Sequence, residues 1–475
     1  MLAKARSALI VLALVLLLGG TAMVGRMWWD SRLPGTYSVM DHGSLDGGGG
    51  DLAGHDHGSA QPIDLTELRE APGGPDARFT LTARQADVRL PGGPLVHALT
   101  FDGRLPGPEL RVQQGDLVEV TLRNEDIRGG VTIHWHVHAV LPGHRYRYRF
   151  RAKQLGTFWY HTHQAAAKDV RRGLFGAFVI EPARRASKAL DLVLLSHLFS
   201  GTPTLNAVAG TGRRAVKPGT AVRLRLVNTD STSQRFTLTG TPFRVVAVDG
   251  NDLSGPTPLT DTPLELGAGG RYDLAFTMPA RPVGLSTASG HATLALSPDG
   301  TGDPPPPVRG PDFDPLVYGT PAPTPFDAKT RFDRSFAMDI TRKIGFFDGR
   351  PGKHWAINGR IFPDVPVFAV ERGDLVKVTI ANRSGALHPM HLHGHHVLVL
   401  SRNRVAATGS PWWSDSLNVA AGDRYEVAFL ANNPGIWMAH CHNLPHAAEG
   451  LTMHLAYAGV RTPFRIGTRV DNRPE

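Results

Sequence analysis

The stretch His440-Cys441-His442-Asn443-Leu444-Pro445-His446 contains the only cysteine of the 475-residue chain and surrounds it with three histidines. A thiolate and imidazoles are the ligands that copper favours in a trigonal electron-transfer site. Successive side chains of a strand point to opposite faces, so Cys441 would face one metal site while His440 and His442 face another. A lone buried cysteine is ordinarily a packing residue, and the remaining histidines of the chain decide between the two interpretations.

The composition favours a protein built from strands and turns. A chain of this length has room for about three domains. The 53 glycines and 37 prolines, without long helical periodicity, indicate many short strands. The net charge of +9 is spread without a basic run or an interleaved aromatic patch. We therefore expect no nucleic-acid partner.

The N-terminus is predicted to be a targeting segment. Two basic residues precede a charge-free run over residues 8–25, which fits a signal sequence or a marginal membrane span. Trp28 and Trp29 suit a membrane interface. We predict that residues 1–26 are a signal peptide or a membrane anchor, and we favour an uncleaved anchor. The rest of the chain is then exported to the cell envelope or the extracellular space, where an unpaired thiol is a liability unless a metal holds it.

Residues 27–75 are predicted to form a flexible tether. The run Gly47-Gly48-Gly49-Gly50 and the polar and small residues around it cannot make a core. His42, His55 and His57 lie in this segment and are interpreted as incidental histidines of a solvated linker.

A pattern of alternating apolar and polar residues then occurs three times. Residues 115–124 match residues 373–382, and residues 219–228 are a weaker third copy. Alternation with a period of two predicts a half-buried strand of a sandwich. An Arg-Tyr strand follows in every copy, and a strand ending in a histidine pair follows in the first and third copies.

Three copies of one sandwich explain these repeats better than chance does. The predicted fold is therefore all-β, with three consecutive Greek-key β-sandwich domains behind the N-terminal segment and the tether. The predicted limits are 76–183 for the first domain, 188–300 for the second, 301–325 for a Pro-rich linker, 326–460 for the third and 461–475 for a tail.

The first copy is shorter than the other two. The distance to the Arg-Tyr strand is 52 residues from Gly219 in the second copy and 51 from Gly373 in the third, but 30 from Gly115 in the first. The difference falls immediately after His136. The first domain therefore lacks about twenty residues after its first histidine pair.

The outer copies each carry two His-x-His or His-Cys-His pairs, and the middle copy carries none. Alternate residues of a strand share a face, so the two rings of a pair can serve one cluster. If the outer copies pack face to face, eight imidazoles converge, which suits three copper ions with open positions for a small ligand. The eight are His134, His136, His161, His163, His391, His393, His440 and His442. Cys441, His388 and His446 remain as a separate site with two histidines and one cysteine.

These motifs, over roughly residues 76–460, resemble the multicopper oxidases of the laccase-like type with three cupredoxin domains. The resemblance implies four coppers per chain. It implies type 1 copper at His388, Cys441 and His446, type 2 copper at His134 and His391, and a type 3 pair at His136, His161, His163, His393, His440 and His442. The axial position of the type 1 site falls on Leu451, which cannot coordinate. A missing axial donor favours Cu(I) and raises the potential, and Met453 is a weaker candidate for that position.

The resemblance implies an oxidase. A phenol, an aromatic amine or cuprous ion would give single electrons at the type 1 copper. Cys441, His440 and His442 would carry them to the cluster, where O2 is reduced to water. The alternative is a copper-binding or copper-sequestering envelope protein in copper tolerance, with little turnover. A nitrite-reducing relative is a weaker option because it would not need His442.

Two departures from the family pattern motivate the alternative. The acidic segment that relatives carry after the first histidine pair is missing, and Ala447 replaces the carboxylate after the last type 1 histidine. Reduction of O2 to water consumes four protons, so a proton donor near the cluster matters. Glu449 and Asp169 are near in sequence and are candidate substitutes.

Overall fold

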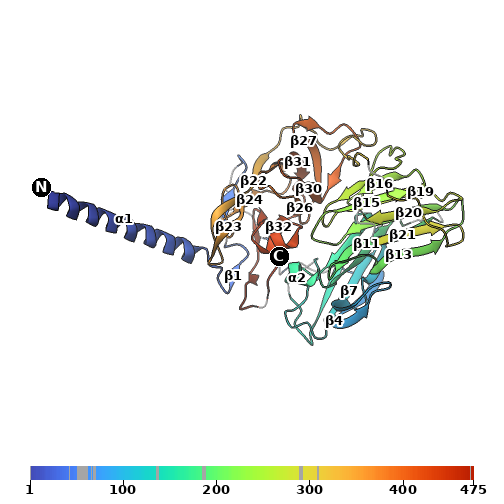
Figure 1. The fold of residues 1–475 in the computed structure, drawn as a ribbon, viewed down its shortest axis with the longest axis horizontal. Coiled ribbons are helices and arrows are strands. Elements are labelled where there is room, and N and C mark those ends of the chain that lie inside the picture. Colours follow the sequence, from blue (N-terminus) through green and yellow to red (C-terminus); the bar gives the residue numbers. More distant parts are fainter. Residues whose placement is uncertain are drawn as a thin grey trace.

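The computed structural model describes residues 2–41, 43–50, 63–65, 67, 71–134, 139–183, 189–287, 292–307, 310–470 and 472–474, with side chains from residue 10 onward. Three β-sandwiches follow one long N-terminal helix, α1 (Leu2–Asp30). Figure 1 shows α1 projecting away from a body that consists almost entirely of strands. The prediction of an all-β protein with three cupredoxin-like domains behind an apolar segment is confirmed.

The first domain is a sandwich of a four-stranded and a three-stranded sheet. Val118, Val120 and Leu122 are all fully buried, as their alternation predicted, and they form part of this domain's own core. The first sheet has the order β5 (Leu95–Phe101), β4 (Ala77–Arg89), β7 (Leu117–Asn124), β8 (Arg145–Arg151), and the second has the order β6 (Gly107–Gln113), β10 (Phe175–Glu181), β9 (Gly156–His161).

The second domain folds around one continuous eleven-stranded sheet. Its apolar core continues into the third domain, so these two sandwiches are tightly joined. The strand order is β17 (Asn251–Asp252), β16 (Arg244–Val248), β19 (Arg271–Thr277), β14 (Ala221–Asn228), β11 (Leu190–Phe199), β12 (Thr202–Leu205), β13 (Val208–Ala215), β21 (Ala292–Ser297), β20 (Val283–Thr287), β15 (Gln234–Thr239), β18 (Leu264–Leu266).

The third domain packs a six-stranded sheet on a seven-stranded sheet. The six-stranded order is β2 (Ser44–Asp46), β24 (Pro366–Val370), β33 (Thr452–Tyr457), β32 (Ile436–Cys441), β26 (His388–Leu392), β30 (Ser416–Val419). The seven-stranded sheet has the order β23 (Arg350–Ile357), β22 (Arg334–Phe347), β25 (Leu375–Asn382), β31 (Arg424–Leu430), β27 (Val397–Arg402), β28 (Val405–Ala406), with β29 (Trp413–Ser414) beside β27.

The segment predicted as a flexible tether differs from that expectation. Strand β2 pairs in parallel with β24 at the edge of the third domain, and Arg334 donates to the carbonyl of Gly47 at 3.1 Å. Two further short pairs, β1 (Tyr37–Ser38) with β35 (Arg465–Ile466) and β3 (Ile63–Asp64) with β34 (Val460–Arg461), join this segment to the C-terminal tail. An open sheet edge offers unpaired backbone groups, and here the Gly-rich segment satisfies them. His42, His55 and His57 lie outside the described residues.

The shortening of the first domain is visible in its strands. Between β25 and β31 the third domain contains β26 to β30, whereas the described residues between β7 and β8 contain only the isolated bridge from Val131 to Val140. The first domain therefore has no counterpart of β27, β28 and β29 within its described residues. Two short helices complete the body, α2 (Ala166–Asp169) and α3 (Leu444–Ala448), and side chains from both enter one apolar cluster with the second domain.

Candidate metal centre

Three donor atoms converge at one end of the third sandwich. The Sγ of Cys441 lies 3.5 Å from the Nδ1 of His388 and 3.7 Å from the Nδ1 of His446, and the two nitrogens are 3.2 Å apart. Cys441 ends β32, His388 begins β26, and His446 lies on α3. Cys441 and His388 are fully buried, and His446 is half-buried. A thiolate with two imidazoles is the donor set of electron-transfer copper.

Neighbouring side chains hold the two imidazoles of this site. The Oγ of Ser384 lies 2.7 Å from the Nε2 of His388, which leaves Nδ1 directed at Cys441. The ring of Trp355 packs on both histidines, with centroids 4.9 Å from His388 and 4.4 Å from His446. Such contacts to the far side of a ligand fix its ring orientation.

Two apolar residues near the end of α3, where the motif predicts the axial position, are buried. Leu451 is fully buried, and its carbonyl accepts a hydrogen bond of 3.1 Å from the amide of Cys441. Met453 is also fully buried, on β33 opposite Ala439. A leucine side chain has no atom that can coordinate, so Leu451 supplies packing alone.

The register between β26 and β32 separates two sets of ligands. His391 is paired with His440, and Met390 is paired with Cys441. Paired residues of antiparallel strands point to the same face, and successive residues point to opposite faces. His440 and His391 therefore share one face, while Cys441 points to the other. The alternation inferred from the sequence is present.

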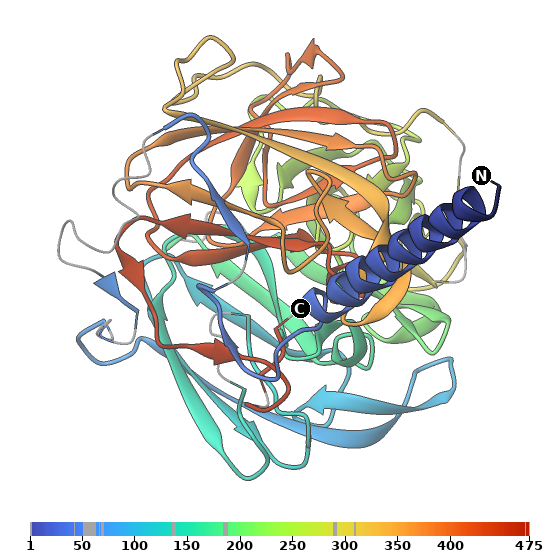
Figure 2. The same ribbon diagram turned by 90° about the vertical axis from the view of Figure 1, so that its left-hand side faces the viewer.

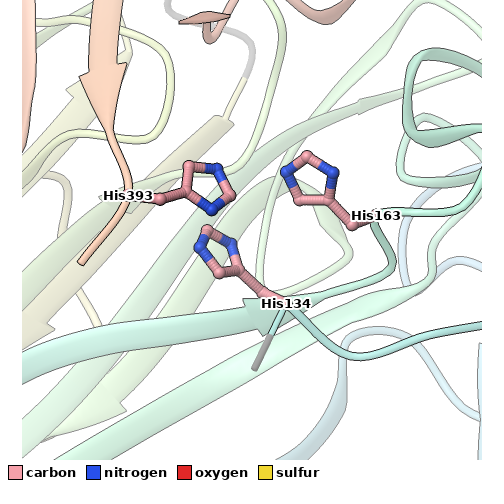
Figure 3. A group of neighbouring side chains, drawn as sticks. All are labelled: His134, His163 and His393. Carbon is pink, nitrogen blue, oxygen red and sulfur yellow. The ribbon is translucent and has the colours of Figure 1, made fainter. Parts of the chain in front are cut away.

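Imidazoles of the first and third domains meet across one interface. The ring of His134 stacks on that of His393 at a centroid distance of 4.2 Å, and His163 lies 4.9 Å from His393. Farther along the interface, the rings of His161 and His442 are 5.6 Å apart. Figure 3 shows His134 and His163 turned toward His393 of the other domain. The outer domains therefore pack face to face.

The ligand nitrogens at this interface form two overlapping groups. Within each group the atoms lie within 4.8 Å of one another, and His393 belongs to both. The groups are His134, His163 and His393, and His391, His393 and His440.

Backbone carbonyls select the ring nitrogen that faces the interface. The Nδ1 of His161 donates to the carbonyl of Thr162 at 2.8 Å, and the Nδ1 of His440 donates to the carbonyl of Cys441 at 3.0 Å. His391 uses the carbonyl of Asp415 in the same way. A neutral imidazole that donates from Nδ1 presents the lone pair of Nε2. This is the tautomer that a metal at the interface requires.

Buried nitrogens at the interface lack other partners. The Nε2 atoms of His163 and His391 and the Nδ1 of His442 are buried without a hydrogen bond among the described residues. Burial lowers the pKa of His161 to about 4 and that of His440 to about 3, so these rings are neutral near pH 7. Orphaned buried nitrogens are costly unless something binds them. Neutral imidazole lone pairs with an adjacent thiol site fit copper.

Comparison with known proteins decides the family. Family models described as multicopper oxidase match residues 328–459 and residues 82–141 and 137–185. The chain belongs to the multicopper oxidase family. It is 26% identical over 474 residues to multicopper oxidase MmcO of Mycobacterium tuberculosis, covering 84% of this chain and 91% of that protein. Laccase-1 of Botryotinia fuckeliana is 25% identical, with 78% and 80% covered. The crystal structure of a multi-copper oxidase from Pseudomonas thermotolerans matches with a TM-score of 0.64 and 27% identity, covering 81% of this chain and all of that one.

As a multicopper oxidase, the protein binds copper and uses O2 as its electron acceptor. Each histidine that the motifs predicted as a ligand, and that the structure describes, lies at one of the two sites. His136 lies outside the described residues, so its place stays a prediction. The Nε2 of His395 hydrogen-bonds to the hydroxyl of Tyr457 at 2.6 Å, and its Nδ1 donates to the carbonyl of the cluster residue His393 at 3.1 Å.

Sequence reasoning missed an acidic residue beside His391. The Asp415 carboxylate accepts hydrogen bonds from Arg271 of the second domain and lies 3.3 Å from the Nε2 of His396. Arg271 also lies 3.5 Å from the carboxylate of Asp249, and all three groups are buried or nearly so. Burial alone would raise the pKa of Asp415, but the Arg271 guanidinium holds it well below its usual range. Burial raises the pKa of Asp249. No local sequence pattern identified Asp415. The pairing of β26 with β30 places His391 opposite Ser416, and Asp415 is the residue before Ser416.

The two proton-donor candidates occupy different places in the oxidase. Glu449 lies at the thiol site, where the indole of Trp355 donates to its carboxylate at 3.0 Å. Asp169 is buried at the end of α2, six residues after His163. Burial raises the pKa of Asp169 to about 6.

A pocket of about 380 Å³ connects the interface with the surface. Its walls come from all three domains and include exposed residues such as Lys153 and Gln154 together with the cluster histidines His134, His391 and His442. Arg271 and Asp415 also line it. The pocket is therefore an aqueous approach to the histidine interface.

Proposed function

We propose that this oxidase is laccase-like: it takes single electrons from a phenol, an aromatic amine or cuprous ion at Cys441, His388 and His446, and reduces O2 to water at the histidine interface. The observation that carries the proposal is the pair of adjacent donor sets, with the thiolate ligand and two imidazole ligands on consecutive residues of β32 and the loop after it. Copper bound at these sites supplies one-electron transfer at the first and four-electron reduction of O2 at the second.

The ligand assignment follows the motif order of the family. Type 1 copper is assigned to His388, Cys441 and His446, and type 2 copper to His134 and His391. The remaining six histidines, His136, His161, His163, His393, His440 and His442, are assigned to the type 3 pair. The tautomers fixed at His161, His391 and His440 by backbone carbonyls support this use of their Nε2 atoms.

Residues of the chain provide separate places for oxidation of the reductant and for reduction of O2. His446 is the half-buried ligand, so a reductant meets its edge before the fully buried His388 and Cys441. One peptide unit separates Cys441 from His440 and another separates it from His442, which gives a short covalent path between the two sites. The pocket beside Lys153 and Gln154 offers O2 a way in and water a way out.

We assign proton delivery to Asp169 ahead of Glu449. Asp169 follows the cluster ligand His163 on a short helix and keeps a raised pKa, whereas Glu449 is engaged by Trp355 at the thiol site. A carboxyl group whose pKa lies near the working pH can both release and regain a proton, which suits a general acid. Unchanged O2 turnover in both Asp169→Asn and Glu449→Gln would remove this assignment.

Oxygen consumption with a simple phenol tests the function. The copper-loaded chain should consume O2 and show the intense charge-transfer colour of a copper–thiolate bond. Cys441→Ser should lose both, while His97→Gln, which changes an exposed histidine of the first domain, should keep both. A coloured protein that binds copper but consumes no O2 would instead support copper sequestration.

A further inference from the structure

The end of the apolar helix α1 is hydrogen-bonded to the third domain. Within α1, the segment Ile10–Asp30 has a mean hydropathy of 2.1 and is long enough to cross a bilayer. At its end, the Nε1 of Trp28 donates to the carbonyl of Gly349 at 3.0 Å, and the amide of Gly349 donates to the Oγ of Ser31 at 3.2 Å. Gly349 lies in the turn between β22 and β23. The helix end and this hairpin therefore have a fixed relation, and Figure 2 shows α1 leaving the body beside the third domain.

The same hairpin presents an exposed aliphatic side chain among cations. Ile344 is 83% exposed, more than any other large hydrophobic residue of the described chain. It is the cross-strand partner of Lys353, so the two side chains share a face. Arg342 and Arg350, on the two strands of the hairpin, are also exposed. Arg342 and Lys353 lie on the face of Ile344, whereas Arg350, the partner of Phe347, lies on the other face. An aliphatic group beside basic residues suits the interface of a bilayer that contains anionic lipids.

The hairpin also covers the thiol site. The guanidinium of Arg342 lies 4.5 Å above the ring of Trp355, which in turn packs on His446. Nearer the turn, Phe347 lies so close to Gly450 that a Cβ there would be 2.9 Å from its ring. Gly450 follows α3, the helix that carries His446. One hairpin thus connects the end of the membrane-length helix with the histidine where electrons enter.

We propose that α1 stays in the membrane and that the β22–β23 hairpin rests on anionic headgroups, so that His446 receives electrons from amphiphilic reductants of the hydroquinone class dissolved in the bilayer surface. This inference rests on the proposed oxidase function. Two hydroquinones release four electrons and four protons as they become two quinones, and these reduce one O2 to two waters. The bilayer concentrates the donor on the face of the protein that bears His446.

A fluorescent label on the hairpin tests the lipid contact without using activity. The full copper-loaded chain is reconstituted in vesicles of phosphatidylglycerol and phosphatidylcholine, with Ile344→Cys carrying the label. Cys441 is fully buried, so the new thiol alone reacts. The matched control is Val405→Cys, 58% exposed on β28 at the opposite edge of the same sheet. We expect spin-labelled lipids to quench position 344 several-fold more than position 405.

Donor preference tests the substrate class. We expect kcat/KM in vesicles to be several-fold higher for an alkyl hydroquinone than for unsubstituted hydroquinone. Ile344→Glu combined with Lys353→Glu should reduce that ratio several-fold, and Val405→Glu combined with Arg404→Glu should leave it unchanged.

Equal quenching at positions 344 and 405, or a mature chain from which α1 has been removed, would overturn the inference. If unsubstituted hydroquinone still supports O2 uptake in that case, the oxidase function stands without the membrane contact. If position 344 is quenched but neither donor supports O2 uptake, the oxidase function fails, and the assignment of the donor class fails with it.

Discussion

At the residue scale, we predict that Leu451 sets the strength of the type 1 oxidant. The family pattern assigns the axial position to this residue, which is fully buried and has no atom that can coordinate. A type 1 copper without an axial donor would have three strong ligands, and this arrangement favours the reduced state. Such a site would be suited to take electrons from donors of moderately high potential, such as the phenols of the proposed function.

Replacing Leu451 by methionine should lower the reduction potential of the type 1 copper. The thioether would become a weak axial ligand, and axial ligation tunes the potential of such sites. A redox titration followed at the charge-transfer band measures the change. Met453→Leu is the control: an unchanged potential in that variant confirms that Met453 does not coordinate, whereas a rise would move the axial role to it.

Asp169 makes the stability of the protein depend on pH. Its folded-state pKa is raised to about 6 by burial, above an ordinary value of 3.8. The folded state therefore holds this proton more tightly, and the contribution of Asp169 to stability falls as pH rises from about 4 to about 6. Asp169→Asn removes this penalty, so it should stabilise the protein at pH 7 by up to about 3 kcal/mol and have no such effect below pH 4.

Thermal or denaturant unfolding at pH 4 and pH 7 measures this difference. Asp364→Asn, at an exposed position paired with Arg360, is the control and should change little at either pH. A gain of stability in Asp169→Asn that is the same at both pH values would contradict the assignment of the penalty to the charged carboxylate.

At the element scale, strand alternation and histidine spacing made most of the site predictable. The alternation of successive side chains along a strand indicated that Cys441 and His440 face opposite ways, and the register of β26 with β32 has this arrangement. The missing residues after the first histidine pair were countable because the three copies repeat. These features are local in sequence or periodic, and so a single chain reveals them.

Contacts between distant strands were not predictable in the same way. The Gly-rich segment before the first domain resembles a solvated linker, yet β2 completes a sheet more than three hundred residues away in sequence. Asp415, whose carbonyl accepts a hydrogen bond from His391, is likewise held by an ion pair with Arg271 of the second domain. Both depend on which sheet edges and buried charges are left to satisfy after the domains assemble.

The buried ion network between the second and third domains should be essential to the cluster. Arg271→Ala would leave the carboxylates of Asp249 and Asp415 buried without their shared cation, and such a loss costs about 3–5 kcal/mol. The carbonyl of Asp415 holds His391, so copper should be lost from the interface before it is lost from the thiol site. Denaturant midpoints and copper content measure the two effects.

Arg223→Ala is the matched control for this prediction. Arg223 pairs with Asp273, which keeps a second partner in Arg225, so no buried carboxylate is left alone. Equal midpoints and equal copper content in the two variants would contradict the role given to Arg271.

At the scale of the whole molecule, the function depends on domains that are far apart in the sequence. The first and third sandwiches supply the facing imidazoles, and the second contributes Arg271 behind them. The hairpin that is hydrogen-bonded to the end of α1 places the thiol-site side of the same assembly beside the membrane-length helix. The pocket lined by residues of all three domains connects this interface with solvent.

The copper content per chain, read together with the paramagnetic resonance spectrum, tests the central claim most directly. Facing imidazoles from two domains that share metal ions next to a thiolate site predict four coppers per chain. The spectrum should contain one type 1 and one type 2 signal, because the type 3 pair is silent. One copper per chain with a type 1 signal alone would show that the shortened first domain does not complete the cluster, and would contradict the account.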